Sequence, residues 1–283
     1  MEIREIIDKD FGKIVMVSND TVELGVAVDF GPRIIHFALA GQDNVLYQDR
    51  DKKPIGEQLA SYDDVFRLYG GHRLWISPEV LPRCYHPDNE PVKWEDVSIG
   101  MKFTAAVEKF NGIEKSMLIT LADNSAKICH EIRNCGAWDI ELAPWAITML
   151  APGGTANIAM TKKGTGLLPN RQIVFWDYTN TQDARIAIGR DFITVKQNKK
   201  SDTALKVGLF NDDLEAGISY ALNGQTFHKY AEAPTGVYPD MGCNYEVYAN
   251  ADFLEAESLG PMTKLAPNET VCHDEYWEIT SEE

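Results

Sequence analysis

Hydrophobic and polar residues alternate with a period of two along most of the chain, which is the pattern of strands that bury one face. Val22, Leu24 and Val26 begin such a run, and after Gly31-Pro32 the apolar residues move to odd positions. We expect a bend or a β-bulge at that Gly-Pro step. Similar runs predict further strands at 101–110, 115–122, 126–134, 140–150, 172–178, 185–196, 204–210, 217–222, 226–230, 245–250, 252–261 and 276–280.

One stretch, 57–69, has helical spacing instead. Its apolar residues recur every three or four positions before Gly70-Gly71 ends the pattern, and the stretch fits either a short helix or an ordered loop. The remainder predicts an all-β fold. So many strands in one domain, 1–283, imply two large antiparallel sheets packed face to face, because a single open sheet of that size would curl or split.

The composition is that of a globular protein, with 283 residues of which 44% are hydrophobic and 25% charged. No apolar run is long enough to span a membrane, and the charged N-terminal residues do not resemble a secretory signal, so we expect a cytoplasmic protein. The net charge of −16 argues against a nucleic-acid partner, since a phosphate backbone would be repelled. An anionic ligand would need a local Arg or Lys.

The five cysteines are scattered and include no Cys-x-x-Cys pair, which favours reduced thiols over a disulfide framework. Cys129-His130 with Cys135, and Cys272-His273, bring metal-ligand types together without the spacing of a zinc site. The chain also lacks a Gly-x-Ser-x-Gly elbow, a Walker loop and a His-Glu-x-x-His motif. We therefore predict neither a metal nor a cofactor.

A first polar block surrounds His72, Arg73 and Trp75, directly after a Gly-Gly pair. This combination suits a carbohydrate, whose hydroxyls bond to Arg and His and whose apolar C–H faces an indole covers. The alternative is structural: Trp75 belongs to the core, Arg73 pairs with a buried carboxylate and His72 is a neutral hydrogen-bonding residue of the interior. A guanidinium in an apolar run is costly without a partner, which favours a functional role for Arg73.

A second polar block contains Asp240, Asn244, Glu246, Glu255 and Glu257, of which we expect Asp240 and Asn244 to bind the substrate. Glu255 and Glu257 stand two residues apart in a predicted strand, so their side chains should project from one face. Two neighbouring carboxylates raise at least one pKa, which yields an acid or a base that works near neutral pH. An ion pair with Arg73 remains open for one of the two, and Glu246 fits better as a residue of a solvated acidic edge.

Several segments together resemble the galactose mutarotase-like superfamily. They are 21–35, 44–47, the Gly-Gly-His-Arg-Leu-Trp block ending at Trp75, 142–146, 152–154, 255–261, 265–269 and 275–278. The resemblance implies a β-supersandwich that binds a hexose, with a late-strand glutamate as the base that deprotonates the C1 hydroxyl. Glu257 or Glu255 matches that glutamate, with Glu257 preferred, and Arg73 matches a ligand of the sugar hydroxyls.

The chain departs from that family at one position. Family enzymes protonate the ring oxygen with a mid-chain histidine, where this sequence has Trp145 within Ala143-Pro-Trp-Ala-Ile-Thr148. Either His72 supplies the acid for aldose 1-epimerase-like anomer interconversion, or Trp75 and Trp145 are stacking platforms of a non-catalytic carbohydrate-binding or sensing protein. A third possibility is another reaction on a sugar acid or polysaccharide, such as β-elimination, with Arg73 neutralising the uronate. The partner that we expect is a small sugar or sugar derivative.

Overall fold

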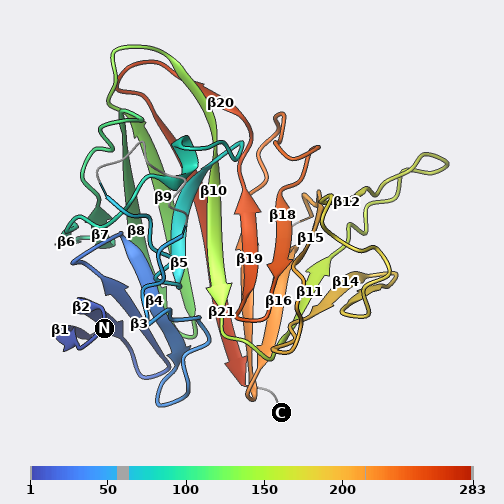
Figure 1. Ribbon diagram of the computed structural model, residues 1–283, viewed down its shortest axis with the longest axis horizontal. Coiled ribbons are helices and arrows are strands. Elements are labelled where there is room, and N and C mark those ends of the chain that lie inside the picture. The colour runs from blue at the N-terminus through green and yellow to red at the C-terminus, as the bar shows by residue number, and fades with distance from the viewer. Residues whose placement is uncertain (1, 56–63, 214, 282–283) are drawn as a thin grey trace.

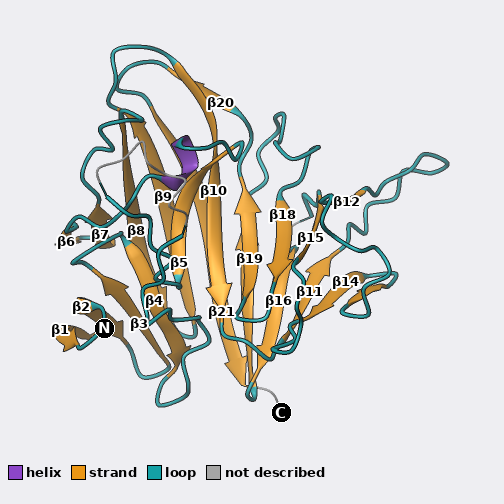
Figure 2. Ribbon diagram, viewed as in Figure 1, coloured by secondary structure: helices purple, strands orange, loops and turns teal. Residues whose placement is uncertain are grey.

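Two large antiparallel sheets packed face to face form the protein in a computed structural model that describes residues 2–55, 64–213 and 215–281 (Figure 1). Nearly all regular structure in these ranges is strand, and their one helix is the short 3₁₀ turn η1, Arg83–Tyr85 (Figure 2). The predicted all-β supersandwich is confirmed. No helix in the described ranges is long and apolar enough to cross a membrane.

The first sheet has eleven strands. In spatial order they are β1 (Glu2–Asp8), β2 (Gly12–Ser18), β3 (Val22–Ala27), β4 (Arg33–Leu39), β5 (His72–Ser77), β10 (Ile140–Leu150), β19 (Leu254–Leu259), β18 (Tyr245–Ala249), β15 (Leu205–Leu209) and β12 (Ile173–Phe175), with β20 (Thr263–Leu265) paired to β10. Strands distant in sequence thus lie side by side at its centre.

The second sheet has ten strands. In spatial order they are β13 (Ile186–Ile188), β14 (Phe192–Lys196), β11 (Thr155–Ala159), β16 (Gly217–Leu222), β17 (Gln225–Ala231), β21 (Thr270–Ser281), β9 (Ser125–Asn134), β8 (Ile113–Ala122), β7 (Gly100–Thr104) and β6 (Lys93–Val97). The long strands β9 and β21 lie next to each other and span the middle of this sheet.

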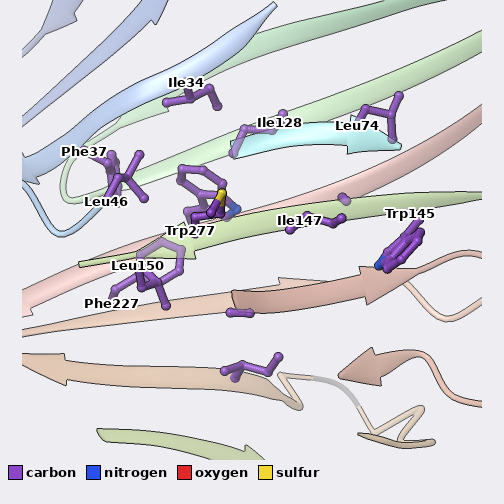
Figure 3. Close-up of a cluster of buried hydrophobic side chains, with 14 of the residues drawn as sticks. Ile34, Phe37, Leu46, Leu74, Ile128, Trp145, Ile147, Leu150, Phe227 and Trp277 are labelled. Atoms are coloured by element: carbon purple, nitrogen blue, oxygen red, sulfur yellow. The ribbon is translucent and has the colours of Figure 1, made fainter. Parts of the chain in front are cut away.

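The core lies between the sheets, where apolar side chains from the facing surfaces of both sheets interdigitate. Figure 3 shows Leu74 from the first sheet in one cluster with Ile128, Phe227 and Trp277 from the second. Phe227 and Trp277 meet edge to face with ring centroids 5.1 Å apart, a favourable arrangement of aromatic quadrupoles. Alternation along each strand therefore sends every second residue into this layer and its neighbours to the outer face.

The structure corrects the sequence-based description in two respects and confirms it in a third. Residues 57–63 of the predicted helix lie outside the described residues, and 64–69 are not helical, since Arg67 forms an isolated bridge with Pro54. The bend expected at Gly31-Pro32 is confirmed, and the register shift between β3 and β4 falls separately, at Gly25 and Val26. The strands β1, β2, β5, β6, β11 and β20 were not predicted.

Candidate functional site

Polar side chains gather on the outer face of the central strands β5, β10, β19, β18 and β15. Direct cross-strand partners share a face, and the register aligns Arg73, Ile147, Glu257 and Glu246 in one row. Glu255 lies on the same face as Glu257, two residues earlier, as alternation predicts. We call this surface, with its residues Arg73, Glu246, Glu255, Glu257 and Lys206, the carboxylate face.

Glu257 is fully buried at the centre of the carboxylate face. Its Oε2 accepts hydrogen bonds from the indole Nε1 of Trp145 at 2.7 Å and from Nζ of Lys206 at 2.8 Å. Its Oε1 has no hydrogen-bond partner among the described residues. Two strong donors thus fix one oxygen and leave the other available, which is the arrangement of an oriented base.

Lys206 joins two buried carboxylates. Its Nζ lies 2.8 Å from Glu257 and 2.7 Å from Oε2 of Glu246, and all three side chains are almost completely shielded from solvent. Burial lowers the pKa of Lys206, but the two glutamates outweigh this effect and raise that pKa well above its usual value. The ammonium is therefore a permanent positive charge beside Glu257.

Glu255 is less tightly held than Glu257. Its cross-strand neighbours in the sheet register are Met149 on β10 and Tyr248 on β18. Burial and the neighbouring charge of Glu257 raise the pKa of Glu255 to about 7, although Arg73 and Lys206 act in the opposite direction. Glu255 is thus partly protonated near neutral pH. A partly protonated carboxyl group beside Glu257 is suited to donate a proton.

Arg73 lies at the edge of this face and is only 4% exposed. Its guanidinium carbon sits 4.1 Å from the ring centroid of Trp75 and 5.3 Å from that of Phe66. Its Nε and Nη1 atoms have no hydrogen-bond partner among the described residues. Burial lowers the pKa of Arg73 to about 10, so the side chain still carries its charge at neutral pH.

The expected platform role of Trp75 and Trp145 is not supported by their positions. The two rings pack edge to face at 5.4 Å, and cationic groups cover them, with the guanidinium of Arg73 4.1 Å from the ring centroid of Trp75 and Nζ of Lys206 4.8 Å from that of Trp145, whereas stacking on a sugar needs an open ring face. Trp176 and Tyr178 are more exposed, and the ring centroid of Trp176 lies 4.7 Å from Nζ of Lys206. These two residues are better placed to contact a ligand.

The structure separates the two remaining residues of the second polar block. Asp240 lies beside Glu246, and burial raises the pKa of its carboxyl group, so it extends the carboxylate face. Asn244 instead donates to the backbone carbonyl of Asn211 at 2.8 Å and accepts from the backbone N–H of the same residue, also at 2.8 Å. Its amide is therefore used in the fold and not available for a ligand.

His72 does not join the carboxylate face. It precedes Arg73 in β5, so its side chain projects to the opposite side of the sheet, where its Nε2 lies 2.8 Å from Nε2 of His130 on the second sheet. The expectation that His72 and Glu257 act on one sugar is wrong on this geometry. His72 is fully buried between the sheets, as the structural alternative supposed.

His72 belongs to a group of buried polar residues that we call the inter-sheet cluster. Its members are His72, His130, Thr148, Lys229, Ser258, His273 and Glu275. Nζ of Lys229 lies 2.7 Å from Oε1 of Glu275 and also donates to Thr148, 2.9 Å away. Burial alone would raise the pKa of Glu275, but the ammonium of Lys229 holds it below its ordinary value.

The hydrogen-bond chain fixes the tautomers of the two facing histidines. Nδ1 of His130 donates to the backbone carbonyl of His273 at 2.9 Å, which leaves its Nε2 to accept from Nε2–H of His72. Nδ1 of His72 then accepts from the hydroxyl of Thr148 at 2.9 Å. Burial lowers the pKa of both histidines, in agreement with neutral rings.

The inter-sheet cluster also has the composition of a metal site. His72, His130 and Glu275 offer ligand atoms within 4.8 Å of one another. The facing ring nitrogens are already joined by a hydrogen bond, and Lys229 already compensates the carboxylate. A hydrogen-bonded network that includes the Lys229 ammonium therefore accounts for the cluster without a metal ion.

The Cys-His pairs do not form sites. Cys129 and His130 are successive residues of β9, and Cys272 and His273 are successive residues of β21, so each histidine points between the sheets while its cysteine points outward. All five cysteines are free.

Sequence reasoning missed the importance of Lys206 and Glu246. Glu246 was expected at a solvated edge, yet it is fully buried against Lys206. Lys206 lies between Leu205 and Val207, which face the core, and a lysine within such an apolar strand is a signal that it has a buried partner.

Similar folds are known among solved structures. A galactose mutarotase-like protein from Clostridium acetobutylicum matches with a TM-score of 0.63 at 10% identity, over 99% of this chain and 98% of that one. A galactose mutarotase-like protein from Lactobacillus casei matches with a TM-score of 0.57 at 9% identity over 94% and 100% of the two chains. A candidate aldose 1-epimerase from Escherichia coli K12 matches with a TM-score of 0.55 at 12% identity over 95% and 99%.

The chain thus has the galactose mutarotase-like fold, a class whose solved members include candidate sugar epimerases. Neither a protein-family model nor a curated protein matches the sequence. At identities of 9–12%, these structures establish the fold and leave the activity to be argued from the site.

Proposed function

We propose that the protein binds a sugar on the carboxylate face and interconverts its anomers, as an aldose 1-epimerase does. The observation that carries this proposal is the state of Glu257. One oxygen is fixed by Trp145 and Lys206 while the other is free, on a late strand of a mutarotase-like fold. A carboxylate held in this way can accept the proton of a C1 hydroxyl.

The second role in anomer interconversion is proton donation to the ring oxygen, which Glu255 can fill in place of a histidine. With a pKa of about 7, part of the population carries the proton that must be given. Glu257 takes the hydroxyl proton, Glu255 protonates the ring oxygen, and the bond between C1 and the ring oxygen breaks. The aldehyde carbon rotates, the ring recloses on the other face, and both protons return.

Saturation-transfer NMR of anomer exchange tests this mechanism. Wild type should exchange at least one aldose faster than buffer, and Glu257→Gln should reduce the rate by roughly 10²–10⁴-fold, the usual effect of losing an acid or base. Glu114→Gln, on the second sheet, is the matched control and should leave the rate unchanged. Circular dichroism must show both variants folded. Exchange that survives in Glu257→Gln would exclude this residue as the base.

The second candidate function is sugar binding without catalysis. It is favoured by the place of His72, which leaves the face without the histidine that the family mechanism uses. Tryptophan fluorescence against a glycan library separates the two functions, because binding with no anomer exchange supports the non-catalytic one. No response to any glycan would exclude both.

A further inference from the structure

Arg73 differs from every other buried cation in the part of the chain that the structure describes. The buried Arg and Lys residues are Arg33, Arg73, Arg185, Lys206 and Lys229. Four of them have a carboxylate within ion-pair distance. The pairs are Arg33 with Asp88, Arg185 with Asp183, Lys206 with Glu246 and Glu257, and Lys229 with Glu275. Arg73 has none among the described residues, although it is 4% exposed.

An unpaired buried guanidinium is costly, because desolvation of its charge and of its N–H groups is not compensated. The aromatic rings of Trp75 and Phe66 cover the guanidinium and offer only a weak cation–π attraction. Among the acids, Glu255 and then Asp88 act most strongly on the pKa of Arg73, but Glu255 forms no ion pair with it and Asp88 is already bound by Arg33. The Nε and Nη1 donors thus have no partner in the part of the chain that the structure describes, and the ligand chemistry that matches them is an oxyanion.

The position of Arg73 connects this partner to the proposed sugar site. Arg73, Ile147 and Glu257 are direct cross-strand neighbours on β5, β10 and β19, so their backbones span about 10 Å at the usual strand spacing. A pyranose with its C1 hydroxyl at Glu257 would lie over Ile147 and direct its far substituent towards Arg73. Arg73 also lines a pocket with Asp88, Glu90 and Glu108, which leaves room beside its guanidinium, although Ile147 and Glu257 are not among the residues that line this pocket.

We propose, on the basis of the sugar-binding function above, that the ligand is a sugar acid and that Arg73 binds its carboxylate. A carboxylate is favoured over a phosphate by the charges of the site. The carboxylate face and its neighbour Asp240 bring four acidic groups together, and burial raises the pKa of Glu246 and Asp240, so the negative charge of the site rests mainly on Glu257 and on the ionised fraction of Glu255. Among the described residues of this face, Lys206 and Arg73 are the cations. A phosphate group, with close to two negative charges, would be repelled more strongly than a carboxylate with one.

Isothermal titration calorimetry with glucuronate, galacturonate, glucose, galactose and glucose 6-phosphate tests the proposal. Wild type should bind one uronate at least about 10-fold more tightly than the matching neutral sugar or the phosphate. Arg73→Gln should remove that preference and weaken uronate binding by about 10- to 100-fold, with little effect on neutral sugars. Arg73→Lys keeps the charge without the planar fork and should fall between the two. Arg133→Gln, on the exposed face of β9, is the control and should behave as wild type.

The outcomes separate this proposal from the proposed function. Uronate binding that depends on Arg73 but produces no anomer exchange supports the sugar-acid ligand and refutes the epimerase. Anomer exchange of neutral sugars, with equal affinity for neutral and acidic sugars, supports the epimerase and overturns the sugar acid. Tighter binding of glucose 6-phosphate than of either uronate overturns it as well. If Arg73→Gln does not fold, the thermal shift of wild type decides: a uronate must raise Tm more than the neutral sugar, and an equal shift overturns the proposal.

Discussion

Replacing Lys229 by Met tests whether the inter-sheet cluster is held by a buried charge pair. Lys229 is fully buried and donates to Glu275 at 2.7 Å, to Thr148 at 2.9 Å and to the backbone carbonyls of Ala146 and Ala256 at 2.9 and 3.0 Å. The substitution removes the cation and leaves the Glu275 carboxylate without it in the core. Loss of one partner of a buried pair destabilises a protein by about 3–5 kcal/mol.

The size of the effect depends on the charge that is left behind, which a second substitution can remove. Trp277 and Ser258 still donate to Glu275 in Lys229→Met, so hydrogen bonds remain while the compensating charge is lost. The double variant Lys229→Met/Glu275→Gln has no buried charge at this position. We expect it to be more stable than Lys229→Met alone, because the unpaired anion is the larger penalty.

Urea denaturation at pH 7 measures these differences as shifts of the midpoint at constant m-value. Lys102→Met is the control, because Lys102 pairs with Glu131 at 2.8 Å in a position where both side chains are about one-third exposed. Such a pair contributes about 0.2–1 kcal/mol. If Lys229→Met costs no more than Lys102→Met, or if the double variant is less stable than Lys229→Met, the charge-pair interpretation is wrong.

Three further predictions concern pH and the carboxylate face. Burial lowers the pKa of His273 to about 4, so its contribution to stability is complete above the ordinary histidine pKa of about 6.5 and is lost as the pH falls towards 4. The unfolding free energy should fall by about 3 kcal/mol over this range. A urea midpoint that stays constant between pH 7 and 4 would contradict this prediction. Trp145→Phe removes the 2.7 Å bond to Glu257 and should lower the unfolding free energy by about 1.5–3 kcal/mol in the same assay. Lys206→Met leaves Glu246 and Glu257 buried without a cation, which raises the pKa of a carboxyl group in the folded state. The variant should therefore lose more unfolding free energy, relative to wild type, at pH 8 than at pH 5. An equal loss at the two pH values would argue against the pairing.

The two glutamates of β19 could be predicted from the sequence because their placement depends only on local geometry. Alternation in a strand puts Glu255 and Glu257 on one face whatever the rest of the fold does. The apolar residues around them, Leu254 and Ala256, are fully buried on the other side. A period-two pattern with two acids in phase was sufficient for this part of the site.

The orientation of His72 could not be predicted in the same way. All six residues of β5 are buried, so the strand has no alternation between polar and apolar positions that would mark its two faces. Which face His72 takes depends on its pairing with Thr148 of β10, a residue 76 positions away in the chain. The side of the sheet on which a histidine lies decides whether it can reach a sugar, and that information is not local.

The partners of the buried lysines were hidden for the same reason. Lys206 is separated from Glu257 by 51 positions, and the contact exists only because β15, β18 and β19 are neighbours in the sheet. A lysine at a position in phase with buried apolar residues, as Lys229 is with Phe227, indicates that a compensating anion exists. It does not indicate which of the 43 acidic residues supplies it.

The two faces of the central strands differ in how completely their polar groups are satisfied. Between the sheets, Lys229 and Glu275 balance in charge, and the facing histidines and Thr148 form a closed chain of donors and acceptors. On the outer face, by contrast, buried atoms of Arg73 and Glu257 remain without partners among the described residues. Unsatisfied buried groups lower stability, and on the outer face they coincide with the residues to which we propose that a sugar binds. Substitutions of the residues between the sheets should therefore change the unfolding free energy, whereas substitutions of Arg73 and Glu257 should change the affinity for a ligand.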